Sequence, residues 1–222
     1  VICDAVGTVG NIPTGSINRF PVTLSGIVSV TNNEPATGGF DEETDDELRD
    51  RYFEKVSLPA TSGSKYHYIQ WAKEINGVGD AKCLPLWNGN GTVKVIIINS
   101  EKGVASDELI DEVKNHIEEN RPIGAEVTVE SAEPLTIDVS VSLTLAAGAS
   151  LETAKEKINE SITRYLQKNA FSQVYISYAQ IGGCILACDE IADYSDLKLN
   201  GDTQNITVSE TQVPVLGVVT VA

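Results

Sequence analysis

The chain has 222 residues, of which 41% are apolar and 22% are charged, and its formal net charge is −16. This composition suits one large domain or about two to three small ones, and it excludes a disordered acidic polymer. The excess of carboxylates disfavours nucleic acid and anionic membrane surfaces as partners, and no apolar run approaches the roughly 20 residues that span a bilayer. Basic or neutral protein partners fit this charge better.

Residues 1–37 are rich in Gly, Val, Thr and Pro, and an alternating run from Val22 to Val30 predicts a strand. A lone pair of strands is marginal in water, so we expect this segment to complete a domain with chain upstream of Val1 or with another part of this chain. The sequence opens on Val-Ile-Cys-Asp and contains no methionine. We therefore expect a portion cut from something longer.

Residues 38–80 predict a helical hairpin. The first helix begins after Thr44, which has the spacing of a capping box with Glu47. Residues 41–50 hold seven carboxylates and one arginine, which is −6 of the formal −16. The positive end of a helix dipole favours such a cluster, so over a third of the net charge is explained by one helix start.

The second helix of this hairpin carries an apolar face that includes Tyr68, with Trp71 beside it. From there the pattern changes, and residues 81–132 predict a β-β-α-β subdomain. Its first two strands, Cys83 to Trp87 and Thr92 to Ile98, are joined by Asn-Gly-Asn-Gly, a strong hairpin signal. Its helix is capped by Ser106.

Residues 133–222 predict a second α+β subdomain. It opens on a long alternating strand, Leu135 to Leu145, followed by helices capped by Ser150 and Ser177 and by three short strands. The element order predicts an α+β fold with several small subdomains, in which a helical hairpin precedes two β-α-β type units with mostly antiparallel sheets.

Side chains that would carry chemistry are sparse. The chain has two histidines, His67 and His116, and it lacks the glycine-flanked serine of a nucleophile elbow and the lysine of a phosphate-binding loop. Cys184 and Cys188 are close in sequence, but no second pair of ligands completes a zinc site. We interpret all four cysteines, Cys3, Cys83, Cys184 and Cys188, as buried thiols of a reducing compartment. We predict no catalytic, cofactor-binding or metal-binding residue, no cofactor, and a protein that is not an enzyme.

Several motifs together resemble those of one protein family. The acidic stretch Gly-Gly-Phe-Asp-Glu-Glu-Thr-Asp-Asp-Glu-Leu-Arg-Asp-Arg starts at residue 38, and Trp71-Ala72 and Gly77-Val78-Gly79-Asp80-Ala81 follow it. Gly89-x-Gly91-Thr92-Val93 and Arg121-Pro122-x-Gly124-Ala125 come next. This arrangement resembles the baseplate J-like family of contractile phage tails, which occurs in Mu-like phages, defective prophages and tailocins.

The resemblance implies a structural protein of a contractile-tail baseplate. It implies a wedge subunit present in several copies, located in the virion tail baseplate and assembled in the bacterial host cytoplasm. Its implied partners are other baseplate and tail proteins and copies of itself, with no nucleic acid and no membrane.

We assign a candidate interface to the helical hairpin, at Arg49, Arg51, Tyr52, Tyr68 and Trp71. For the two arginines, pairing with carboxylates of their own helix is as good an interpretation as an interface role.

A second hypothesis comes from the β-α-β units themselves. Paired units of this kind commonly form sensors, so a small-molecule-binding regulatory α+β module is the alternative function.

Overall fold

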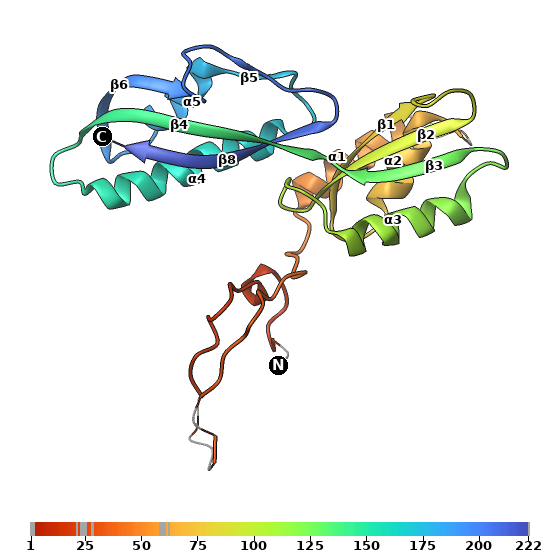
Figure 1. Ribbon diagram of the computed structural model, residues 1–222, viewed down its shortest axis with the longest axis horizontal. Coiled ribbons are helices and arrows are strands. Elements are labelled where there is room, and N and C mark those ends of the chain that lie inside the picture. Colours follow the sequence, from red (N-terminus) through yellow and green to blue (C-terminus); the bar gives the residue numbers. More distant parts are fainter. Residues whose placement is uncertain are drawn as a thin grey trace. The chain divides into compact units, whose positions relative to one another are not determined.

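The computed structural model describes residues 3–20, 22, 26, 27, 29–57, 61 and 63–221. The chain divides into two compact units, Val1–Pro59 and Ala60–Ala222, and each is described by itself (Figure 1).

The described residues of the first unit contain little regular structure before the helix α1. A 3-10 turn, η1 (Thr8–Gly10), is followed by an antiparallel bridge in which Ile12 and Ala36 exchange both backbone hydrogen bonds, and the unit ends in α1 (Asp45–Ser57). The predicted strand from Val22 to Val30 lies partly outside the described residues, and its described residues belong to no strand. None of the described residues of this unit is buried.

The second unit begins with a three-stranded sheet of order β1-β2-β3, covered on one face by two helices (Figure 1). Its strands are β1 (Val78–Pro85), β2 (Thr92–Asn99) and β3 (Glu126–Ser131), and its helices are α2 (Lys65–Lys73) and α3 (Asp107–Asn120). β1 and β2 are antiparallel across the predicted Asn-Gly turn, whereas β3 lies parallel to β2 after the crossover through α3.

Side chains on the helix-covered face of β2 form the first core. Val95 and Ile97 are fully buried there against Val113 and Ile117 of α3, and α2 contributes its own apolar face to the same cluster. The helix α3 begins where the sequence predicts, and the hydroxyl of Ser106 accepts from the backbone of Leu109. The start of α2 is capped in the same way by Ser64, whose hydroxyl accepts from the backbone of His67.

The second sheet has the order β6-β4-β8, and β4 again has one antiparallel and one parallel neighbour. Its strands are β4 (Glu133–Leu145), β6 (Ile191–Leu199) and β8 (Gln212–Val221). The accompanying elements are α4 (Leu151–Asn169), α5 (Tyr178–Leu186) and the small ladder of β5 (Tyr175–Ile176) with β7 (Ile206–Thr207). Buried side chains of β4, α4 and α5 form the second core, among them Ile137, Ile158 and Ile181.

A single residue, Ala132, separates β3 of the first sheet from β4 of the second. Its backbone N–H donates to Ile97 O in the first sheet, and the next residue, Glu133, donates to Thr211 O beside the second. Ala132 is buried in a third apolar cluster with Ile96, Ile98, Ala170 and Val213. The two subdomains therefore share an apolar junction.

The α+β class with small subdomains is confirmed. Each of the larger sheets is mixed: β3 returns parallel to β2 after α3, and β8 returns parallel to β4 after β6 and β7. The two helices of the predicted hairpin, α1 and α2, belong to different compact units. The four-segment division at residues 37, 80 and 132 stays a prediction.

Candidate interaction surface

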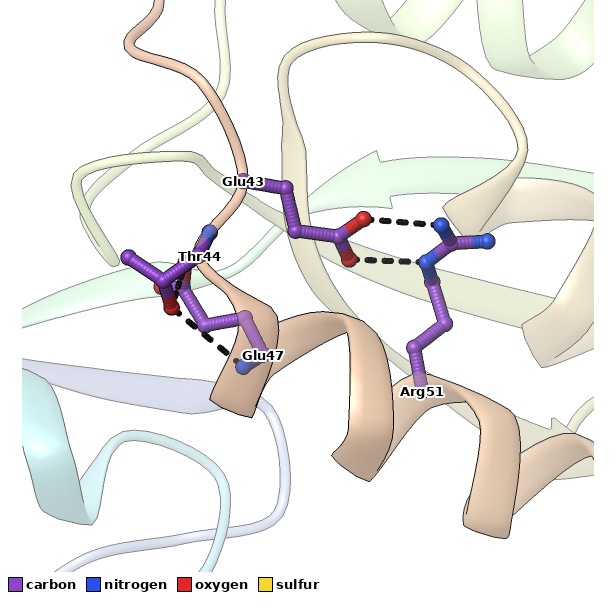
Figure 2. A network of polar contacts seen from close by, with 4 residues as sticks. All are labelled: Glu43, Thr44, Glu47 and Arg51. Atoms are coloured by element: carbon purple, nitrogen blue, oxygen red, sulfur yellow. Dashed lines mark hydrogen bonds and ion pairs between the residues drawn. The ribbon is translucent and has the colours of Figure 1, made fainter.

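The start of α1 is fixed by a reciprocal pair of contacts. The backbone N–H of Glu47 donates to Thr44 Oγ1 at 3.3 Å, and Glu47 Oε2 accepts from the backbone N–H of Thr44 at 2.8 Å (Figure 2). This is the capping box that the sequence predicts, and it satisfies backbone donors that a helix start otherwise leaves unpaired.

Both arginines of α1 are paired within their own segment. Arg51 donates two parallel hydrogen bonds to Glu43, from Nε to Oε1 and from Nη2 to Oε2, and each is 2.8 Å long (Figure 2). Arg49 Nη1 donates to Asp46 Oδ1 at 2.6 Å. The guanidinium of Arg51 lowers the pKa of Glu43 and the carboxylate raises the pKa of Arg51 in return. These exposed pairs orient side chains more than they stabilise the fold.

The segment that leads into α1 is tied to the beginning of the chain. Asn11 makes a reciprocal pair with the backbone of Gly39, and Thr8 donates its backbone N–H and its hydroxyl to Asp41 at 2.8 and 2.7 Å. These bonds favour the ionised carboxylate, so the pKa of Asp41 is lowered. The acidic stretch is thus held by specific bonds.

Large apolar side chains of α1 lie in solvent. Leu48, Tyr52 and Val56 follow one another at helical spacing and are 47%, 61% and 62% exposed, and Phe53 beside them is 56% exposed. The Tyr52 and Phe53 rings meet edge to face with centroids 5.8 Å apart. We call these four residues the α1 surface. Contiguous exposed apolar side chains with a charged border are typical of a protein–protein contact.

Tyr68 and Trp71, which the sequence assigned to the candidate interface, lie in the first core of the second unit. They are 2% and 6% exposed and pack edge to face in the first core, with centroids 5.2 Å apart, because α2 lies against β1 and α3. Burial also raises the pKa of Tyr68. Neither side chain is available to a partner, so the assignment of these two residues is corrected. Arg49, Arg51 and Tyr52 remain as candidates.

Phe53 is a member of this surface that the sequence pattern did not predict. Its position directly after Tyr52 lies outside the Leu48-Tyr52-Val56 stripe, so helical periodicity gave no reason to select it. The adjacency of two aromatic side chains in an acidic helix was the available signal.

The alternative, a small-molecule site, would use a depression of about 350 Å³ beside α4 and α5. Polar side chains line it, and several are already engaged: Tyr165 Oη accepts from the backbone of Ser177, and Asn169 donates to Tyr165 O. Ligand sites are usually apolar with a few convergent polar groups, and this lining differs from that pattern.

The histidines and cysteines are spread over the second unit and the chain start. His116 Nε2 lies 2.9 Å from Glu74 Oε2. The rings of His67 and Trp71 pack in a tilted arrangement with their centroids 3.9 Å apart. Cys188 donates its thiol to Cys184 O at 3.4 Å. Cys188 is buried and Cys83 and Cys184 are partly buried, whereas Cys3 is exposed, so the prediction of a buried thiol is wrong for Cys3. Across the described residues, no three His, Cys, Asp or Glu side chains are grouped so as to hold a metal ion. No helix in the described part of the chain has the length and apolarity needed to cross a membrane.

Three consecutive family models match the chain. They are the baseplate J-like protein barrel domain at residues 1–39, the baseplate J-like central domain at residues 60–131 and the baseplate J-like protein C-terminal domain at residues 137–222. The chain therefore belongs to the baseplate J-like family, as the sequence motifs predict. α1 lies in the interval between the first two matches.

Relatives of this chain occur in bacterial genomes and in a phage. It is 37% identical over 227 residues to the uncharacterized protein YqbT and 36% identical over 225 residues to the phage-like element PBSX protein XkdT, both of Bacillus subtilis. These alignments cover 99% and 98% of this chain, which spans 65% of each relative's length. Baseplate protein gp47 of Escherichia phage Mu is 33% identical over 95 residues, or 42% of this chain and 26% of gp47.

A solved structure shares the fold. A chain in the cryo-EM structure of the anti-feeding prophage (AFP) baseplate, six-fold symmetrised, superimposes with a TM-score of 0.59 at 12% identity. The superposition covers 97% of this chain and 51% of that chain. At this identity, the likeness concerns the fold alone.

Proposed function

We propose that this chain is a structural part of a contractile-tail baseplate and joins neighbouring subunits through the α1 surface. The observation that carries the proposal is a helix whose start is fixed by polar contacts while its large apolar side chains lie in solvent. Burying such side chains against a partner gains about 25 cal/mol for each Å² of apolar area removed from water.

Membership of the baseplate J-like family and the similarity to baseplate protein gp47 of phage Mu support this role. The chain spans 65% of its Bacillus relatives, so the partners of the whole protein belong to the proposal. They are other baseplate proteins and further copies of this chain, assembled in the host cytoplasm into a tail baseplate. The role requires no catalysis, cofactor, nucleic acid or membrane.

A pair of variants of the full-length protein tests the proposal. Tyr52→Ser with Phe53→Ser removes the aromatic part of the α1 surface, and Tyr175→Ser is a matched control because Tyr175 is 44% exposed in the second unit. Cells that carry all tail genes should give far fewer particles with the double variant than with the control. Normal incorporation of the double variant would contradict the role of α1, and absence of the wild-type chain from purified particles would contradict the function.

A further inference from the structure

Two loops of the second unit lie together at one end of the first sheet. Residues 86–91 connect β1 to β2, and residues 121–125 connect α3 to β3. The backbone N–H of Glu126 donates to Gly91 O at 2.8 Å, and a side chain on Gly91 would lie 3.4 Å from Gly124 O. Figure 1 shows both loops at the end of this sheet that is remote from β4.

These loops expose large apolar side chains. Leu86 is 62% exposed, Trp87 43% and Ile123 105%. Ile123 buries nothing against its own chain, although an isoleucine side chain gains about 1.5–3 kcal/mol when it is buried. We call Leu86, Trp87 and Ile123 the apolar tip.

The first loop is held in one conformation. Leu86 donates its N–H to Thr92 O at 2.7 Å, and the buried hydroxyl of Thr92 donates to Gly89 O at 2.7 Å while accepting from Asn88 N at 3.0 Å. Lys94 Nζ lies 3.9 Å from the centroid of the Trp87 ring and 2.8 Å from Glu130 Oε2. Its apolar side chains are therefore exposed from a structured turn.

The second loop is also braced from within. Arg121 Nη1 donates to Ala125 O at 2.5 Å, its guanidinium also pairs with Glu118, and Ala125 donates its N–H to Pro122 O. Because these bonds fix the loop backbone, binding through this loop costs little backbone conformational entropy, which favours a role as an interface anchor.

The chemistry of the tip defines its partner. Residues 86–92 and 122–125 contain no charged side chain, and the two cations beside them are already paired, Arg121 with Glu118 and Lys94 with Glu130. A charged group buried against them would lose its hydration without gaining a counter-charge, so the complementary surface is apolar and uncharged. The net charge of −16 disfavours an anionic membrane or nucleic acid as that surface.

The size of the tip argues against a free pair of identical chains. An aromatic side chain such as Trp87 buries about 150–250 Å² and the smaller Leu86 and Ile123 bury less, whereas a stable interface takes about 800 Å² from each partner. The tip is thus one anchor within a larger contact that other surfaces complete.

We propose that the apolar tip inserts into an uncharged apolar pocket of a neighbouring, different protein subunit in the assembled baseplate. This inference rests on the proposed function, and it adds to the α1 surface a second contact on the other compact unit. A subunit with one contact on each unit would connect two neighbours.

Hydroxyl-radical footprinting of the full-length protein, free and in purified particles, tests the inference. Trp87 and Ile123 should be oxidised several-fold more slowly in particles than in the free protein, while Val218, 67% exposed on β8, keeps its rate. Absence of the chain from wild-type particles would overturn the proposed function. Its presence with Trp87 and Ile123 as reactive as in the free protein would overturn the tip contact alone.

Paired variants give a second readout. Leu86→Ser with Ile123→Ser should reduce incorporation into particles several-fold, and Val104→Ser with Val218→Ser, at residues 43% and 67% exposed, should leave it unchanged. Folding of each variant is checked by urea unfolding, and a tip variant that folds and is incorporated normally overturns the proposal.

Two other occupants are tested with the free protein. Sedimentation that shows a dimer abolished by Leu86→Ser with Ile123→Ser would replace the different subunit by a second copy. Binding to phosphatidylcholine vesicles that the same variant abolishes would replace it by a membrane. Either result overturns the inference, and a monomer that leaves the vesicles unbound supports it.

Discussion

Gly182 of α5 lies directly against the phenol of Tyr194 in β6. A side chain at residue 182 would collide with Tyr194 Oη and would stand 3.1 Å from the ring carbon Cζ. The neighbouring Gly183 faces open space, and a methyl group added there would have no atom within 4 Å. These two adjacent glycines therefore have different roles, and only the first is needed for close packing.

Gly182→Ala should destabilise the protein by about 1–3 kcal/mol, because the added methyl group forces α5 or Tyr194 to move. Gly183→Ala should instead stabilise it by about 0.5–1 kcal/mol, because alanine restricts the unfolded chain and meets nothing in the folded one. Urea unfolding of both variants measures the difference, and equal stabilities would show that α5 and β6 are not in close contact.

Thr44→Ala should loosen the start of α1. Loss of an N-cap side chain costs about 1 kcal/mol, and here it removes one side of the capping box with Glu47. Hydrogen exchange of the first-turn amides should quicken, while amides of α3, which Ser106 caps, keep their rates. Thr44→Ser retains the hydroxyl and should behave like the wild type.

Arg51→Gln should raise the pKa of Glu43 towards its ordinary value, since Arg51 is the largest cause of its lowering. Because the pKa of Glu43 is lower in the folded than in the unfolded chain, the ion pair stabilises the fold at pH values above the unfolded-state pKa of Glu43. This stabilisation is lost as the pH falls through the folded-state pKa. Carboxyl ¹³C NMR titration measures the shift. Arg49→Gln is the control, because Arg49 pairs with Asp46.

Cys83 should resist thiol reagents that label Cys3. Burial raises the pKa of Cys83 to about 11, so only about one thiol in a thousand is ionised at pH 8, whereas Cys3 is exposed. Site-resolved mass spectrometry at pH 8 should find Cys3 alkylated first and Cys83 much later. Denaturant should abolish the difference, and equal rates in the native protein would contradict the burial.

Local signals in the sequence predicted local structure well. Ser106, Ser150 and Ser177 each precede a helix and accept a backbone N–H in its first turn, as their spacing indicates. Strand pairing was harder, because alternation identifies a strand without its neighbour. The parallel pairs β2–β3 and β4–β8 bring together residues far apart in sequence, and no short motif encodes them.

The candidate site shows the same limit. Tyr68 and Tyr52 are both aromatic residues on apolar stripes of short helices, yet one is buried in its own chain and the other is 61% exposed. The sequence did not predict the apolar tip for another reason. Residues 83–87 predict a strand, but β1 ends at Pro85, and Leu86 turns the chain away with a φ of 58°.

Ala132 gives the second unit a mechanical property. The chain passes from β3, bonded to β2, into β4, bonded to β8, with one residue between them. A pulling force along this chain is carried in shear by many hydrogen bonds of both ladders at once, and no flexible linker absorbs it. We therefore expect the two sheets to move together, since a single residue that is itself hydrogen-bonded to β2 leaves no length of chain between them to act as a hinge.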